Sequence, residues 1–145
     1  MEAGLDSGPL LSQRLQPLTP DMTGGELHDR LAQLGALLLQ ESLPRLKAGT
    51  LSAIPQPLDG VTYAAKITPQ DERIDWQRPA LRIKQQICAL NPWPAAHTLL
   101  DGKPLKLFRC HLGGGTGAAG TLIARQGDGP EIACGQGSLV ITEVQ

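Results

Sequence analysis

Aromatic residues are scarce in this chain of 145 residues, which has only Tyr63, Trp76, Trp93 and Phe108. Three of the four fall within residues 61–94. Because aromatic side chains bury large areas with fixed shapes, a chain with few of them tends to place them where separate pieces meet. We therefore predict that this stretch joins an α-rich part to a β-rich part and that its tryptophans are buried there.

The chain also lacks paired cysteines and long apolar runs. Cys88, Cys110 and Cys134 follow no CxxC or Cys/His spacing, which favours free thiols in an intracellular protein. No window approaches the roughly 18 apolar residues of a membrane span, and no signal pattern opens the sequence. We expect a cytoplasmic monomer that contacts no membrane and holds no metal.

A strong excess of either charge is absent as well, since the formal net charge is −1. The two halves nevertheless differ. Residues 1–60 carry four Lys and Arg against seven Asp and Glu, whereas residues 61–145 carry nine against seven. A surface that binds anions should therefore lie in the second half.

The most secure predicted element is a helix within residues 22–49. It opens with a capping box formed by Thr23 and Glu26, in which each residue accepts a hydrogen bond from the other's amide. Pro44 should kink or end the helix, and Gly49 suits the position after its end. Leucines at a helical spacing form one apolar stripe: Leu27, Leu31, Leu34 and Leu38.

A second helix is predicted after Pro79, where apolar residues again share one face. They are Ala80, Ile83, Ile87 and Leu90. Beyond Pro94, short strand-like runs separated by Gly turns favour a small antiparallel barrel. The runs are residues 97–100, 103–112, 120–126, 131–134 and 139–144. Alternation of apolar and polar residues predicts a further edge strand over residues 10–18.

One glycine pattern invites a nucleotide-binding interpretation. Gly115-Thr116-Gly117-Ala118-Ala119-Gly120 fits GxGxxG. A dinucleotide site also needs a helix that opens at the motif and an acidic residue about 20 positions later. Because the residues that follow favour a strand, we interpret the motif as a flexible hairpin loop.

Several segments, taken in this order, resemble the methionyl-tRNA formyltransferase family. They are Gly4-Leu5-Asp6-Ser7-Gly8, Thr23-Gly24-Gly25-Glu26-Leu27-His28-Asp29-Arg30-Leu31, Val61-Thr62-Tyr63-Ala64-Ala65-Lys66-Ile67, Ile74-Asp75-Trp76 and Asn91-Pro92-Trp93-Pro94. The resemblance spans essentially the whole chain but only the later part of the family's length.

It implies an α+β chain. Residues 1–49 would be the end of an α/β formyltransferase catalytic domain, left as a strand plus a long helix. Residues 50–72 would be a linker, and residues 73–145 an OB-like antiparallel β-barrel that stops early.

The resemblance also implies a reaction, the transfer of a formyl group from 10-formyltetrahydrofolate to the amino group of initiator methionyl-tRNA. In that family an Asn and a His act with an Asp, and only the Asp has a counterpart here, at Asp6. Gly4, Leu5 and Asp6 would form the part of the formyl-donor site that this sequence contains. A carboxylate can act as a general base, but the oxyanion needs separate donors. We therefore expect no turnover from the chain alone. Without the resemblance, Asp6 would be a common turn residue.

For tRNA, the candidate contacts are basic residues of the second half: Lys66, Arg73, Lys103, Lys106 and Arg109. Lys66 is the best single candidate. Lys103 and Lys106 should point to opposite faces of one strand, which weakens a common patch.

Two alternatives remain open. The first is a non-catalytic tRNA-binding module. The second is a related formyltransferase that acts on an amino-sugar nucleotide and shares the Gly-Leu-Asp-Ser-Gly loop. Residues 61–67 favour the tRNA enzyme.

Overall fold

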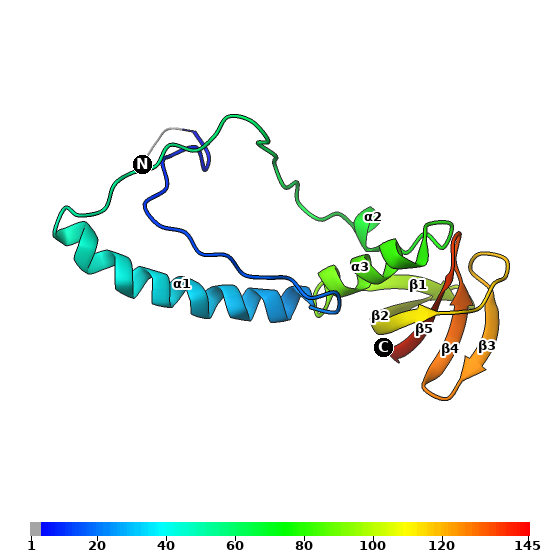
Figure 1. Cartoon of the computed structure of the whole chain (residues 1–145). Coiled ribbons are helices and arrows are strands. Elements are labelled where there is room, and N and C mark those ends of the chain that lie inside the picture. Colours follow the sequence, from blue (N-terminus) through cyan, green and yellow to red (C-terminus); the bar gives the residue numbers. More distant parts are fainter. Residues whose placement is uncertain (1–3) are drawn as a thin grey trace. The chain divides into compact units, whose positions relative to one another are not determined.

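The computed structural model describes residues 4–145, apart from the side chains of Arg125 and Gln126 (Figure 1). It divides into two compact units, which are considered separately. Unit one runs to Leu18 and continues over His28–Lys66, and unit two comprises Thr19–Leu27 and Ile67–Gln145. Within the described residues, the model contains no helix that is both long and apolar enough to cross a membrane.

Helix α1 (Gly24–Lys47) starts where the capping box predicts. The Thr23 amide donates to Glu26 Oε2 at 3.0 Å, and the Glu26 amide donates to Thr23 Oγ1 at 3.1 Å. Gly49 lies just past the helix with φ 68°, a left-handed conformation that glycine adopts without strain. Of the two effects predicted for Pro44, an end of the helix is not observed, since Pro44 lies inside α1 and the helix continues to Lys47.

The edge strand predicted over residues 10–18 is wrong. Among the described residues, the β-pairing of this segment is limited to an isolated antiparallel bridge between Leu10 and Ile54, whose amides and carbonyls exchange two hydrogen bonds of 2.8 Å. Alternating residues become a strand only beside a continuous partner strand. Residues 11–18 belong to no strand or helix.

Two helices of unit two precede its sheet. Helix α3 (Ala80–Leu90) buries Ala80, Ile83, Ile87 and Leu90, the face predicted from their spacing. Helix α2 (Pro69–Glu72) lies in a region predicted to be a linker. The Thr68 amide and hydroxyl both donate to Asp71 Oδ2, at 2.8 and 2.7 Å. These hydrogen bonds lower the pKa of Asp71 below its ordinary value.

The second half of unit two is one five-stranded antiparallel sheet, as predicted in type and nearly in boundaries. The strands are β1 (Ala96–Leu100), β2 (Lys103–Gly113), β3 (Leu122–Gln126), β4 (Gly129–Ala133) and β5 (Ser138–Val144). Their order is β1-β2-β5-β4-β3, the sheet is a half-barrel, and α3 packs mainly against β2 (Figure 1). Residues 114–121 therefore cross between two non-adjacent strands, β2 and β3. The prediction of a hairpin there is wrong, although the prediction of a loop rather than a helix is confirmed.

The core of unit two lies between α3 and the inner face of the sheet. Its most deeply buried apolar side chains are Ile83, Ile87, Ala96, Leu107 and Leu139. All three cysteines are free, as predicted, and Cys134 is buried. Burial raises the pKa of the Cys110 thiol to about 12, so this thiol stays protonated at neutral pH.

The prediction that the two tryptophans of residues 61–94 are buried is wrong for Trp93. Tyr63 is 81% exposed and Trp93 is 83% exposed. Trp76 alone is half-buried, and its Nε1 donates to Thr98 Oγ1 at 3.0 Å. The number of aromatic residues in a chain therefore does not predict whether they are buried. The exposed fraction of each ring depends on which parts of the chain pack against it.

Candidate functional site

The predicted catalytic turn lies in unit one. Leu5 is 78% exposed, and Asp6 is exposed with φ 52°, a left-handed conformation that Asp tolerates better than most residues. Gln56 Nε2 holds the turn by donating to the Asp6 carbonyl at 2.8 Å and to the Gly8 carbonyl at 2.7 Å. The turn thus carries an exposed carboxylate, and hydrogen bonds fix two of its backbone carbonyls.

Three nitrogen-bearing side chains stand side by side in unit two. His97 on β1 pairs with Lys106 on β2, and on its other side it forms a parallel bridge with Arg73. The Ile74 amide donates to the His97 carbonyl at 2.8 Å, which fixes this bridge. Laterally paired residues of a sheet point to one face at a strand spacing of about 4.8 Å, so the three positions span roughly 10 Å. We call Arg73, His97 and Lys106 the basic row.

The basic row lies on the outer face of the sheet. Ala96 and Leu107, the next residues along β1 and β2, pair with each other and are buried on the inner face. Arg73 and Lys106 are exposed, and His97 is partly so. Sequence reasoning selected Arg73 and Lys106 but missed His97, since only the strand register brings it between them.

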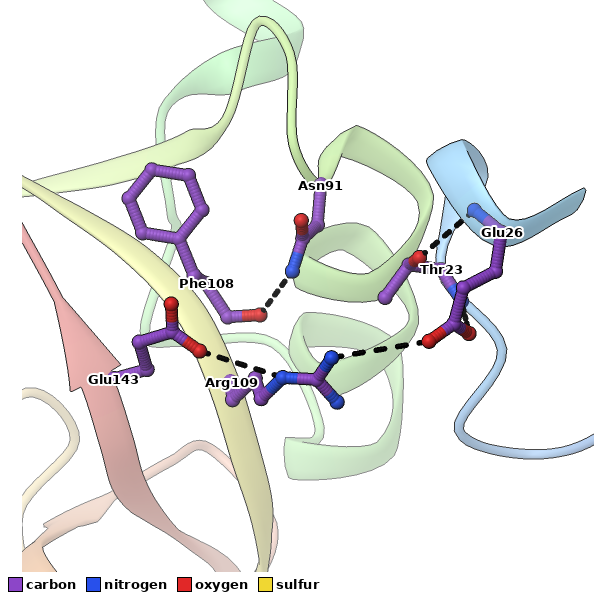
Figure 2. Close-up of polar contacts among 6 residues, drawn as sticks. All are labelled: Thr23, Glu26, Asn91, Phe108, Arg109 and Glu143. Carbon is purple, nitrogen blue, oxygen red and sulfur yellow. Dashed lines mark hydrogen bonds and ion pairs between the residues drawn. The ribbon is translucent and has the colours of Figure 1, made fainter. Parts of the chain in front are cut away.

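The remaining predicted tRNA contacts are placed differently. Lys66 is exposed in unit one. Lys103 is exposed at the start of β2, opposite Leu100, three residues before Lys106. Arg109 is tied to two carboxylates, with Nε 3.3 Å from Glu143 and a terminal nitrogen 3.7 Å from Glu26 (Figure 2). Two nearby negative charges make Arg109 a weaker site for phosphate than a lone cation.

An open hollow adjoins the basic row. It has a volume of about 510 Å³, and its lining includes Arg73, Asp75, Trp76, Gln77 and Gly120. The Gln77 amide donates to Asp75 Oδ1 at 3.0 Å, which occupies part of that carboxylate. The lining therefore combines an indole, which can stack on a planar group, with one cationic and one anionic side chain.

Two consecutive glycines bring the start of α1 against the end of α3. The Gly25 amide donates to the Asn91 carbonyl at 2.9 Å, and a Cβ on Gly25 would lie 2.6 Å from Pro92 Cδ. A Cβ on Gly24 would collide with the Ala89 carbonyl oxygen. The Asn91 side chain in turn donates to the Phe108 carbonyl at 2.7 Å (Figure 2). Sequence reasoning assigned Thr23-Gly24-Gly25-Glu26 to the family without this packing reason.

A buried acid holds the glycine-rich crossover. Glu131 is only 2% exposed, and its Oε1 accepts hydrogen bonds from the Ser138 hydroxyl at 2.6 Å and from the Gly115 amide at 2.7 Å. A Cβ on Gly113 would collide with this carboxylate. The glycines therefore make room for a buried acid, and sequence reasoning missed this role.

Comparison with known proteins identifies the family. Residues 66–145 match the family model described as "Formyl transferase, C-terminal domain". The chain belongs to this family. The resemblance stated from the sequence is thereby confirmed, and the formyltransferase C-terminal domain accounts for the α3 helix and the five-stranded sheet.

Curated relatives extend the match to the whole chain. The chain is 42% identical to the methionyl-tRNA formyltransferase of Myxococcus xanthus (strain DK1622) and 46% identical to that of Trichlorobacter lovleyi (strain ATCC BAA-1151 / DSM 17278 / SZ). Both alignments cover 100% of this chain and 46% of the relative. The chain thus spans about half the length of these relatives, and it matches their C-terminal part.

Solved structures share the fold at low identity. HypX from Aquifex aeolicus, in a crystal structure with tetrahydrofolic acid, aligns with a TM-score of 0.74 and 19% identity, covering 99% of this chain and 25% of that one. The N-formyltransferase from Helicobacter canadensis, in complex with folinic acid and dTDP-3-aminofucose, gives 0.74 and 16% identity over 100% of this chain and 53% of that one. At these identities the likeness concerns the fold alone.

Proposed function

We propose that this chain serves as the C-terminal part of a methionyl-tRNA formyltransferase and holds initiator methionyl-tRNA for formylation by 10-formyltetrahydrofolate. The observation that carries the proposal is identity of 42–46% with enzymes of that name over every residue of the chain. The sugar-modifying neighbour, at 16% identity, supports only a shared fold. The amino-sugar alternative is therefore the weaker one.

The proposed division of labour gives the Asp6 turn only part of the chemistry. Asp6 would act on the reacting amine as a base or as the partner of an imidazolium, and Gly4 and Leu5 would line the formyl-donor site beside it. An Asn and a His supplied by the rest of the enzyme would stabilise the oxyanion. Because one carboxylate cannot supply both functions, this chain would position substrates rather than complete the reaction. We propose a cytoplasmic monomer for it.

The proposed tRNA surface centres on the basic row. Arg73 and Lys106 would bind phosphates on either side of His97, and the hollow beside Trp76 would accept an unpaired base. Lys66 and Lys103 would add peripheral contacts, whereas the two carboxylates around Arg109 make it the weakest of the predicted set. We further propose that the half-barrel is OB-like, and that residues 1–49, 50–72 and 73–145 are the catalytic remnant, the linker and the barrel domain.

A salt titration tests the tRNA assignment. Fluorescently labelled initiator tRNA is titrated with the full chain at several salt concentrations between 50 and 200 mM. Each phosphate contact contributes about −0.7 to −0.9 to the slope of log K against log salt, so Arg73→Ala and Lys106→Ala should each reduce the slope by roughly that amount. Arg82→Ala, an exposed cation on α3, is the matched control and should leave the slope unchanged. Binding insensitive to salt, or an equal loss in the control, would refute the proposal.

A further inference from the structure

The hollow in unit two contains an aromatic ring that the fold holds in place. Trp76 Nε1 donates to Thr98 Oγ1 at 3.0 Å. A Cβ on Gly120 would lie 3.5 Å from the indole Cδ1, so the Gly120 backbone also packs beside the ring. Trp76 is only half-buried, and it lines the hollow. An indole that is already fixed can stack on a flat ring with little further loss of side-chain entropy.

The residue before this indole supplies an oriented carboxylate. Asp75 opens a turn in which the Arg78 amide donates to its carbonyl at 3.1 Å and the Gln77 amide donates to its Oδ1 at 3.0 Å. Asp75 is exposed and lines the hollow. Among the described residues, none donates a hydrogen bond to Asp75 Oδ2. Because each carboxylate oxygen can accept about two hydrogen bonds, both oxygens keep acceptor positions for a ligand.

Arg73 provides a cation in the same lining. Its side chain is exposed, and it makes no ion pair with any described carboxylate. Arg73 also belongs to the basic row, in which it forms a bridge with His97. A guanidinium can bind two phosphate oxygens at once. The volume of the hollow, about 510 Å³, lies within the usual range of about 300–1,000 Å³ for small-molecule sites, so a base and its phosphate can share it.

The carboxylate selects among the bases. Guanine carries two adjacent N–H donors on its Watson–Crick edge, N1–H and the N2 amino group, which match the two oxygens of a carboxylate. Adenine and cytosine have an acceptor nitrogen beside their amino group, and uracil has a single donor between two carbonyls. Those acceptors would face the negative charge of Asp75 without a proton to share. The side-chain amides of Gln70 and Gln77, which also line the hollow, can donate to guanine O6.

We propose that this hollow is a guanine-nucleotide subsite. Trp76 stacks on the base, Asp75 accepts hydrogen bonds from N1–H and the amino group, and Arg73 binds the phosphate. The inference rests on the proposed function, in which the hollow accepts an unpaired base, and it adds the identity of that base. The same chemistry describes a free guanine nucleotide and an unpaired guanosine of tRNA, and binding assays separate these two sources.

Intrinsic fluorescence tests the subsite. Trp93 is 83% exposed and does not line the hollow, and the full chain with Trp93→Phe retains Trp76 as its single tryptophan. This chain is titrated with GMP, AMP, CMP and UMP, with correction for nucleotide absorbance. GMP should quench saturably, with a Kd at least about fivefold below the other three, the lower end of the discrimination that a bidentate pair supplies. Guanosine should bind more weakly than GMP, and Arg73→Ala should abolish this difference.

Two aspartate variants locate the base contact. Asp75→Asn retains an oxygen for the Gln77 amide but removes the negative charge. It should raise the Kd for GMP at least about fivefold and leave the four nucleotides nearly equal. Asp101→Asn is the matched control, because Asp101 is exposed in the turn between β1 and β2 at φ 50°, a conformation that Asn tolerates. It should bind GMP like the parent, and thermal unfolding of each variant verifies the fold.

Three results would overturn the subsite: no saturable quenching by GMP, equal affinity for the four nucleotides before any change at Asp75, and an equal loss in Asp101→Asn. Salt titration of labelled initiator tRNA then distinguishes the source. Asp75→Asn should weaken tRNA binding without reducing its salt slope, because the carboxylate contacts a base rather than a phosphate. Unchanged tRNA affinity would uphold the subsite and assign it to a free nucleotide.

The two proposals can fail separately. A chain that binds GMP selectively but does not bind tRNA would contradict the proposed function and uphold the guanine subsite. A chain that binds tRNA with the expected salt slope but shows no preference for GMP would contradict the guanine subsite alone.

Discussion

The cap of α1 should contribute more stability to unit two than the ion pairs drawn beside it in Figure 2. Thr23 is 6% exposed, and its hydroxyl accepts the Glu26 amide. Thr23→Ala removes that acceptor, and such N-cap losses typically cost about 1 kcal/mol. Arg109 and its carboxylate partners are 47–57% exposed at 3.3 and 3.7 Å, a setting in which pairs contribute about 0–1 kcal/mol and often nothing measurable. Arg109→Gln should therefore cost less than Thr23→Ala.

Thermal and urea unfolding of the full chain, followed by tryptophan fluorescence, measures the difference. Both tryptophans belong to unit two, and the half-buried Trp76 reports on its packing. For a unit of this size, 1 kcal/mol corresponds to a shift of roughly 4–8 °C in Tm. Glu26→Gln retains a side chain that can complete the capping box but removes the charge. It should behave like Arg109→Gln. If Arg109→Gln destabilises the unit as much as Thr23→Ala does, then packing and charge outweigh the cap, and the reasoning fails.

Two further outcomes follow from the same structure. Gly35→Ala should stabilise α1 by about 0.5–1 kcal/mol because open space surrounds that position. Gly24→Ala should destabilise unit two, because the added Cβ would collide with the Ala89 carbonyl. Helicity and Tm measure both variants, and stability changes of the same sign would contradict the packing. The hydrogen bond between His111 Nε2 and Asp128 (2.6 Å) raises the pKa of His111 above its ordinary value near 6.5. The pair therefore stabilises the fold fully at pH values below the ordinary pKa, and this stabilisation is lost as pH rises through the raised pKa. NMR titration should show that Asp128→Asn lowers this pKa, and an unchanged midpoint would exclude the pair as its cause.

Elements set by local patterns could be predicted from the sequence. The capping box located the start of α1, and the spacing of Ile83 and Ile87 identified the buried face of α3. Alternation and glycine turns located the strands of the sheet. In each case the deciding interactions lie within a few residues along the chain, so the pattern alone contains the information.

Features that depend on distant partners were missed or mistaken. The segment at residues 10–18 has strand-like alternation but no ladder. The glycines at 114–121 predict a hairpin, but the segment is a crossover, because local sequence does not determine strand order. His97 joins Arg73 and Lys106 only through the sheet register. The exposure of Trp93 likewise depends on non-local packing.

The acid beneath the crossover has a consequence for sequence searches. Gly113 and Gly115 are constrained from inside the molecule, since any larger residue would displace the Glu131 carboxylate or its donors. A scan for phosphate-cradling glycines would therefore select this loop for the wrong reason. Loops of this kind can be told apart by the atom that a Cβ on each glycine would meet, rather than by the spacing of the glycines. An atom of the protein's own interior indicates packing, whereas open space leaves room for a ligand.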